Sequence, residues 1–243
     1  MKVGILVAVL VIGYFVYTYV VFQQQVTFAK KFSATVHPYE KESSDHSKTL
    51  LILGDSTGTG IGATNPEDSV AGLLAAHIGA TYVENGAKSG SEVSSLQDQI
   101  AKIKLPHYDI ILIQVGGNDV VRFHDSKEVS LLLGSFLTVL NDRADTIYVM
   151  SAGDMGTVTL FPWYVRPYFS YATLALHGAF TAICTQYGAH YINLYEPPAT
   201  NPFVLDPEHY LAPDHFHPSS LGYRAWFEKF LKVENGPQRG HER

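Results

Sequence analysis

The most uniform hydrophobic stretch of the chain lies at its N-terminus, where neither a charged residue nor a proline occurs from Val3 to Phe22. A helix over this stretch would measure about 30 Å, which matches the hydrocarbon core of a bilayer. The stretch ends in bulky residues, whereas a secretory signal usually ends at a small-residue cleavage site. We therefore predict an uncleaved transmembrane anchor over residues 1–22, with a cleaved signal peptide as the alternative.

The charges around this stretch give a small preference for one orientation. Lys2 lies before it and Lys30 and Lys31 lie after it, so the basic residues that favour the cytoplasmic side are nearly balanced. We predict a single-pass membrane protein with its N-terminus inside and its catalytic domain extracytoplasmic. A polar, charged linker over residues 23–48 is expected to join the two parts.

Beyond the linker, short apolar runs alternate with stretches in which apolar residues recur at helical spacing. The strand-like runs are 49–53, 81–84, 108–115, 146–150 and 190–194, and the helix-like stretches are 68–78, 93–103, 126–140, 171–187 and 218–231. This alternation predicts one α/β domain over residues 49–232, with a five-stranded parallel sheet covered by helices on both faces. Residues 233–243 form a polar tail.

Composition and charge exclude several classes of protein. Hydrophobic residues make up 46% of the chain, which is too many for a disordered protein. The formal net charge is -6 and no run of lysine and arginine occurs, so nucleic acid is not an expected partner. Cys184 is the only cysteine, which excludes a disulfide framework and a cysteine-based zinc site. Its apolar, helix-like surroundings predict a buried thiol.

The candidate chemistry begins with a serine near the start of the domain and an Asp-x-x-His near its end. Ser56 follows the first strand-like run, and Asp214 and His217 lie three residues apart before the last helix-like stretch. A serine hydroxyl becomes a nucleophile when a base takes its proton and a third group orients that base. His217 is the candidate base and Asp214 the candidate orienting group, because their spacing lets one loop present both side chains to one point.

Ester cleavage also requires hydrogen-bond donors for the negative charge that develops on the carbonyl oxygen. The backbone N–H of Ser56 is one candidate. Gly86 follows the second strand-like run and offers a backbone N–H that a substrate can approach closely. Asn118 follows the third run and offers its side-chain amide. Because ligands bind beyond the carboxyl ends of parallel strands, these donors are expected to meet at one sheet edge.

Together these blocks resemble those of the SGNH, or GDSL-type, hydrolase family. The resemblance covers residues 49–231 and rests on Gly54-Asp55-Ser56, Asn85-Gly86-Ala87, Gly116-Gly117-Asn118-Asp119 and Asp214-x-x-His217. It implies a flavodoxin-like three-layer sandwich and serine-based hydrolysis of esters or thioesters, with no metal and no other cofactor. Thr57 and Gly58 depart from the family pattern, in which leucine often follows the serine, and this leaves the subfamily and the substrate open.

The sequence therefore predicts a membrane-tethered serine hydrolase that cleaves carboxylic esters through an acyl-enzyme on Ser56. Two substrate classes fit this prediction. Lipid or other acyl esters are favoured by the anchor, and acetyl esters of a cell-envelope glycan are also permitted by the family. The alternative from a different class is a catalytically silent, membrane-tethered binding or scaffold domain of the same fold.

Other residues in these blocks have structural interpretations. Asp55 and Asp119 are expected to brace loops rather than to react. His209 and His215, with the Asp-x-x-His pair, could suggest a metal site, but the triad accounts for two of those four residues. The aromatic-rich segment 161–169 follows the fourth strand-like run. It could be a lid that packs on the core, a wall of an acyl or sugar pocket, or a patch that dips into the membrane.

Overall fold

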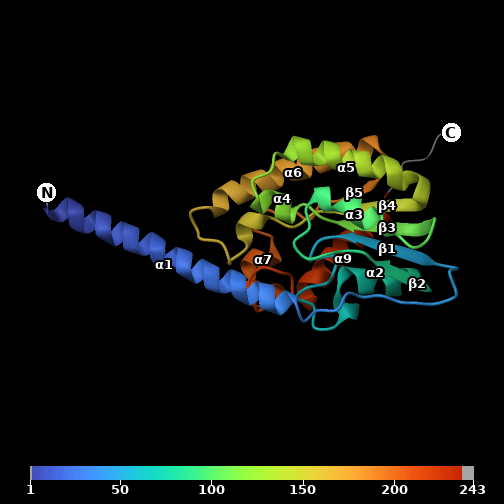
Figure 1. Cartoon of the computed structure of the whole chain (residues 1–243), viewed down its shortest axis with the longest axis horizontal. Helices are drawn as coiled ribbons and strands as arrows, with labels where there is room; N and C mark the ends of the chain where they lie inside the picture. Colours follow the sequence, from blue (N-terminus) through green and yellow to red (C-terminus); the bar gives the residue numbers. More distant parts are fainter. Residues whose placement is uncertain (1, 237–243) are drawn as a thin grey trace.

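The structure, a computed structural model, describes residues 2–236 and contains a five-stranded sheet in the order β2-β1-β3-β4-β5 (Figure 1). Every neighbouring pair is parallel, which confirms the predicted sheet. From β2 the chain returns past β1 to β3, so the topological switch point, where such sheets bind ligands, lies at the carboxyl ends of β1 and β3. The strands are β1 (Thr49–Gly54), β2 (Tyr82–Asn85), β3 (Tyr108–Gln114), β4 (Ala144–Met150) and β5 (His190–Ile192).

Helices cover both faces of the sheet and complete the expected three-layer sandwich. In Figure 1, α5 and α6 lie on one face, while α2 and α9 lie on the other. The N-terminal helix α1 runs along one side of the domain and projects beyond it. The helices are α1 (Lys2–Ser33), α2 (Val70–Ile78), α3 (Leu96–Ile100), α4 (Gly117–Val121), α5 (Ser126–Leu140), α6 (Arg166–Gln186), α7 (Pro202–Leu205), α8 (Pro207–Tyr210) and α9 (Ser220–Glu234).

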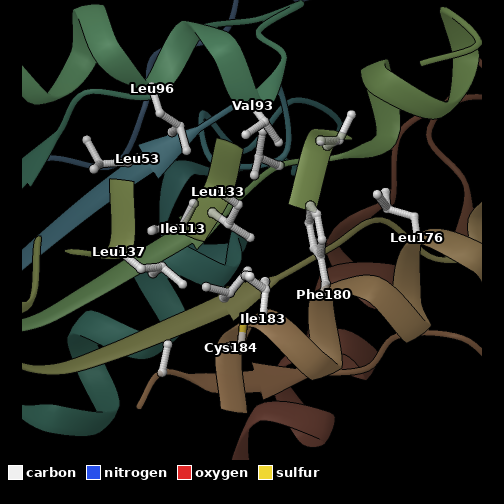
Figure 2. Close-up of a cluster of buried hydrophobic side chains, with 14 of the residues drawn as sticks. Leu53, Val93, Leu96, Ile113, Leu133, Leu137, Leu176, Phe180, Ile183 and Cys184 are labelled. Carbon is white, nitrogen blue, oxygen red and sulfur yellow. The ribbon is translucent and has the colours of Figure 1, made fainter. Parts of the chain in front are cut away.

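Alternate residues of β1 belong to two separate cores. Leu50 and Ile52 pack with α2 and α9, whereas Leu51 and Leu53 pack with α5 and α6. Figure 2 shows the second core, where Leu53 and Cys184 lie among side chains of the covering helices. Because the strand is buried on both faces, it appears in the sequence as an unbroken apolar run. Cys184 is fully buried, as predicted.

Some boundaries differ from those expected. α1 continues to Ser33, so residues 23–33 of the predicted linker are helical rather than extended. α6 begins at Arg166, before the expected start at residue 171, because Pro167 is accommodated in the first helical turn. The short helices α7 and α8 were not predicted, since four residues are too few to display a helical hydrophobic period.

Candidate active site

β1 delivers Ser56 to the carboxyl edge of the sheet. Gly54 ends the strand at φ +132, and a Cβ on it would lie 1.8 Å from the backbone oxygen of Gln114 on β3. Only glycine therefore allows the two strands to come this close. The side chain of Gln99 bonds both the N–H and the carbonyl of Gly54 at 2.8 Å. These contacts hold the turn that presents Ser56.

His217 lies between Ser56 and Asp214. Its Nε2 is 2.9 Å from Ser56 Oγ, and its Nδ1 is 2.5 Å from Asp214 Oδ2. The exposed fractions of Ser56, His217 and Asp214 are 5%, 4% and 1%. The structure thus brings together the three side chains selected from the sequence. They stand in the order hydroxyl, imidazole, carboxylate that proton transfer from a serine requires.

One tight loop presents both Asp214 and His217. Asp214 Oδ1 accepts the backbone N–H of Phe216 at 3.1 Å and that of His217 at 3.0 Å. His215 adopts φ +56, a left-handed conformation that turns the chain between the two side chains. Ser219 then caps α9 by accepting a backbone N–H from its first turn. The carboxylate therefore holds both the ring of His217 and the backbone that carries it.

Gly62 supports this loop from its other side. It adopts φ +100, and a Cβ on it would lie 2.2 Å from the backbone oxygen of Pro218 and 3.2 Å from His217 Cβ. A larger residue would push the backbone next to His217 and displace its side chain. The close approach of Gly62 therefore contributes to the position of His217.

Two buried carboxyl groups near Ser56 have opposite pKa shifts. Burial opposes ionisation of Asp214, but the hydrogen bond and charge of His217 outweigh it, and the pKa of this carboxyl lies below its usual value. Asp214 therefore stays ionised beside the imidazole. Burial raises the pKa of Asp55 to about 6, partly offset by hydrogen bonds that it accepts from Thr57. Asp55 Oδ1 accepts both the N–H and the hydroxyl of Thr57 at 2.8 Å, which braces the turn around Ser56 as expected.

Asn118 faces the same cavity as Ser56 and His217. One N–H of its side-chain amide donates to the backbone oxygen of Ser91 at 2.9 Å, which holds the amide in place and leaves its second N–H for a ligand. In the part of the chain that the structure describes, the backbone N–H of Ser56 has no protein acceptor. Both groups are therefore available as donors beside the serine hydroxyl.

The structure does not bring Gly86 to this position. Its N–H donates to the backbone oxygen of Ile52 at 2.8 Å, which extends the ladder between β1 and β2. Gly86 lines a different cavity, together with Glu84 and Gln99, rather than the one that contains Ser56. The expectation that its amide faces a developing oxyanion is corrected accordingly.

The loop after β2 contains another glycine, Gly90, which was not among the predicted site residues. Gly90 adopts φ +78, and within residues 2–236 its N–H has no protein acceptor. Its neighbour Ser91 accepts the Asn118 amide, so this loop lies beside the donor on α4. In the sequence, a glycine flanked by two serines, Ser89-Gly90-Ser91, could have indicated this position as a backbone donor.

The cavity at Ser56 has a volume of about 310 Å³. Much of its wall comes from segments without recognised motifs, namely the connection after β5, α7 and α9. Glu196 and Lys229 form an ion pair of 2.7 Å on this wall. Asn201, Phe203 and Trp226 also line the cavity. The cavity therefore combines aromatic surface with charged and amide groups.

The remaining candidates lie outside this cavity. Phe161 and Phe169 of the aromatic-rich segment are buried and pack against each other, so this part of the segment covers the core. No residue of 161–169 lines the cavity at Ser56. His209 pairs with Asp206 at 2.8 Å. Asp119 accepts the backbone N–H of Val93 and braces a loop.

Comparison with known proteins places this geometry in a family. The model of the GDSL-like lipase/acylhydrolase family matches residues 52–225. The chain belongs to this family. A curated relative in it, the GDSL-like esterase Rv1075c of Mycobacterium tuberculosis, is 25% identical over 181 residues. That match covers 72% of this chain and 57% of the relative, so the chain spans little more than half of that esterase.

Solved structures of GDSL proteins share the fold. A variant of Axe2, an acetyl-xylooligosaccharide esterase from Geobacillus stearothermophilus, superposes with a TM-score of 0.58 at 21% identity, covering 81% of this chain and 98% of that one. A lipolytic protein of the G-D-S-L family from Veillonella parvula superposes with a TM-score of 0.60 at 15% identity, covering 77% and 98%. At these identities the likeness concerns the fold.

Proposed function

We propose that the chain is a serine hydrolase that cleaves carboxylic esters through an acyl-enzyme on Ser56. His217 Nε2 takes the hydroxyl proton as Ser56 Oγ attacks the ester carbonyl carbon. The tetrahedral intermediate then expels the alcohol, which receives that proton from His217, and leaves an acyl ester on Ser56. Water, deprotonated by His217, attacks the carbonyl carbon of this ester; the bond to Ser56 Oγ then breaks, the serine oxygen recovers its proton from His217, and the acid leaves. The contact of 2.9 Å between Ser56 Oγ and His217 Nε2, continued to Asp214, carries the proposal.

A serine-directed fluorophosphonate probe separates this enzyme from the silent scaffold. A folded chain with an activated Ser56 is expected to form a covalent adduct, while Ser56→Ala is not. The geometry of the triad favours labelling, because the hydroxyl already has a base within hydrogen-bonding reach. Failure of the folded native chain to react would favour the scaffold interpretation.

We infer that the oxyanion is stabilised by the Ser56 N–H and the Asn118 side-chain amide. Asn118→Ala is expected to lower kcat by about 10²- to 10³-fold, because it removes a preorganised donor. Gly86→Ala is the matched control. The Gly86 amide is already bonded to Ile52, and an added Cβ would lie 3.3 Å from Leu53 Cδ2, which can shift slightly. Its kcat is expected to stay within a few fold of the native value. A loss of kcat in Gly86→Ala as large as that in Asn118→Ala would contradict this assignment.

The cavity favours a short acyl group over a long one. The ion pair of Glu196 and Lys229 and the Asn201 amide share a wall with Trp226. A long alkyl chain laid against this wall would separate charged groups from water, which costs free energy. Axe2, whose fold is shared, is an acetyl-xylooligosaccharide esterase. These observations support acetyl or similarly short esters of a polar alcohol, including an acylated glycan.

A series of p-nitrophenyl esters from acetyl to palmitoyl tests this choice. The kcat/KM of the acetyl ester is expected to exceed that of the palmitoyl ester by about tenfold or more, since pocket contacts to a few methylene groups discriminate on this scale. Rates with Ser56→Ala supply the background for each ester. Higher kcat/KM for the palmitoyl ester would favour lipid substrates instead.

We also propose that α1 tethers the enzyme to a membrane, with the domain extracytoplasmic. The segment Ile5–Ser33 contains a window of mean hydropathy 2.5, none of which is buried in the protein. A signal sequence has the same properties, so retention is the decisive measurement. The full chain is expected to remain with phospholipid vesicles after an alkaline carbonate wash, and its release would contradict the tether.

A further inference from the structure

The domain presents a group of exposed aromatic side chains at the start of α6 and at the end of α4. This aromatic surface consists of Phe123, Trp163, Tyr164, Tyr168 and Tyr171, which are 63%, 67%, 38%, 45% and 72% exposed. Four of them form two ring pairs, with centroids 5.2 Å apart for Phe123 and Tyr168 and 5.9 Å apart for Trp163 and Tyr164. Exposed apolar side chains gathered on one surface mark a site of contact with a membrane, a protein or a ligand.

The chain segment that contributes Trp163, Tyr164, Tyr168 and Tyr171 to this surface carries almost no charge, whereas Phe123 follows Arg122 and precedes His124 and Asp125. Between Asp154 and Glu196, Arg166 is the only lysine, arginine, aspartate or glutamate. Its guanidinium donates to the backbone oxygen of Phe161 at 2.8 Å and to that of Thr159 at 3.0 Å. The single charged side chain of this segment therefore bonds to the backbone of the loop that carries Trp163. These hydrogen bonds within the domain hold the loop in shape.

The aromatic surface is joined to the apolar part of α1. Trp163 Nε1 donates to the hydroxyl of Tyr14 at 2.9 Å, and the rings of Phe15 and Tyr164 lie edge to face at 5.3 Å. Figure 1 shows α1 projecting on the side of the domain where α6 begins. These contacts involve residues within the charge-free stretch Val3 to Phe22, not residues beyond it.

The length of α1 determines how deep in a bilayer these contacts would lie. From Lys2, the charged residue that bounds the apolar stretch, to Tyr14 the helix rises only about 18 Å, at about 1.5 Å per residue. The hydrocarbon core of a bilayer is about 30 Å thick, so this portion alone is too short to cross it. If α1 spans the bilayer, the part from Tyr14 towards Phe22 must also lie within the membrane or its interface. The side chains of the domain that touch Tyr14 and Phe15 must lie there too.

We propose that the aromatic surface inserts into the interfacial layer of the bilayer that α1 crosses. This inference rests on the proposed tether. Tryptophan and tyrosine favour this layer, because their rings are apolar and their N–H and O–H groups can bond to headgroups and water. The inserted loop is connected to the active site by packed rings. The ring centroids of Phe161 and Phe216 are 5.9 Å apart, and those of Phe216 and His217 are 4.8 Å apart. The carboxyl edge with Ser56 is thereby held beside the bilayer surface.

The two tryptophans of the chain allow a direct test. Trp226→Phe leaves Trp163 as the only tryptophan, and Trp163→Phe leaves Trp226, which is 6% exposed inside the domain. Both full-length variants are reconstituted in phosphatidylcholine vesicles, with or without lipid brominated near the headgroup end of its acyl chain. Bromine quenches indole fluorescence only at short range. Trp163 is expected to lose about half or more of its emission, as interfacial tryptophans lie at that depth, whereas Trp226 keeps its emission.

Each outcome has a separate meaning. Flotation of the vesicles in a density gradient reports whether the chain is membrane-bound. If the chain floats with the vesicles but Trp163 fluorescence is quenched by aqueous iodide and not by bromine, the inference is overturned and the tether stands. If the chain does not float, both fail. Equal quenching of Trp163 and Trp226 would also overturn it. Turnover of a soluble p-nitrophenyl ester by the native chain tests the esterase proposal independently. If Trp226→Phe does not fold, the difference in quenching between native chain and Trp163→Phe isolates the Trp163 signal.

Discussion

Ser56→Ala is expected to lower kcat for ester hydrolysis by about 10⁴- to 10⁶-fold, the range found when the nucleophile of a triad is removed. The side chain loses the oxygen that lies 2.9 Å from His217 Nε2, so we expect no acyl-enzyme to form. The backbone N–H of residue 56 remains, and some stabilisation of the transition state by donors persists. Initial rates on p-nitrophenyl acetate, with circular dichroism to verify folding, measure this loss.

Ser130→Ala is the matched control for this substitution. Ser130 is also 5% exposed, but it lies on α5 and donates to the backbone oxygen of Lys127 at 2.9 Å. Removing its hydroxyl makes the same chemical change away from the cavity and should leave kcat within a few fold. Turnover by Ser56→Ala near that of the control would show that another group supplies the nucleophile.

Asp214→Asn is expected to lower kcat by about 10⁴-fold with little change in fold. An asparagine oxygen can still accept the backbone N–H groups of Phe216 and His217 that Asp214 accepts now. The amide cannot stabilise a positively charged imidazole. It can also donate to Nδ1 and so favour the tautomer in which Nε2 carries a proton and cannot take one from Ser56. Rates and thermal melting of the same preparation separate catalysis from stability.

Asp109→Asn provides the comparison for that loss. Asp109 is another hydrogen-bonded carboxylate with a lowered pKa, because hydrogen bonds from Thr49 outweigh its partial burial. It lies near the amino ends of β1 and β3, at the sheet edge opposite Ser56. Its replacement is expected to affect stability rather than kcat. A loss below about tenfold in Asp214→Asn would mean that Asp214 does not orient the base, since such groups contribute far more in other triads.

The layered fold could be predicted because its strands are buried on both faces. A run such as Ile110 to Ile113 has no polar side and is typical of a central parallel strand. The three triad residues could also be selected, since each belongs to a short motif whose chemistry depends on residue type and local spacing. The boundaries of α1 and α6 were less predictable, because polar residues and proline are compatible with helix where tertiary contacts favour it.

The proposed oxyanion donors could be predicted only in part from the local sequence pattern. Gly86 and Gly90 both follow β2, and both could offer an amide to a ligand. The Gly86 amide is bonded to Ile52 and the Gly90 amide has no acceptor among the described residues. That difference depends on the register between β1 and β2, which no motif in either segment encodes. The cavity wall at Phe203 and Trp226 was missed for the same reason, as it joins α7 to α9.

By itself, the sequence determined the order of strands and helices, the apolar helix at the N-terminus and the identities of Ser56, Asp214 and His217. Hydrophobic period and motif spacing are properties of residues close together in the chain, so they can be recognised without knowing the fold. Only the tertiary structure decided which amides face the serine, which side chains line the cavity and that Trp163 meets Tyr14. Those facts are distances between segments far apart in the chain, and packing of the whole molecule sets them.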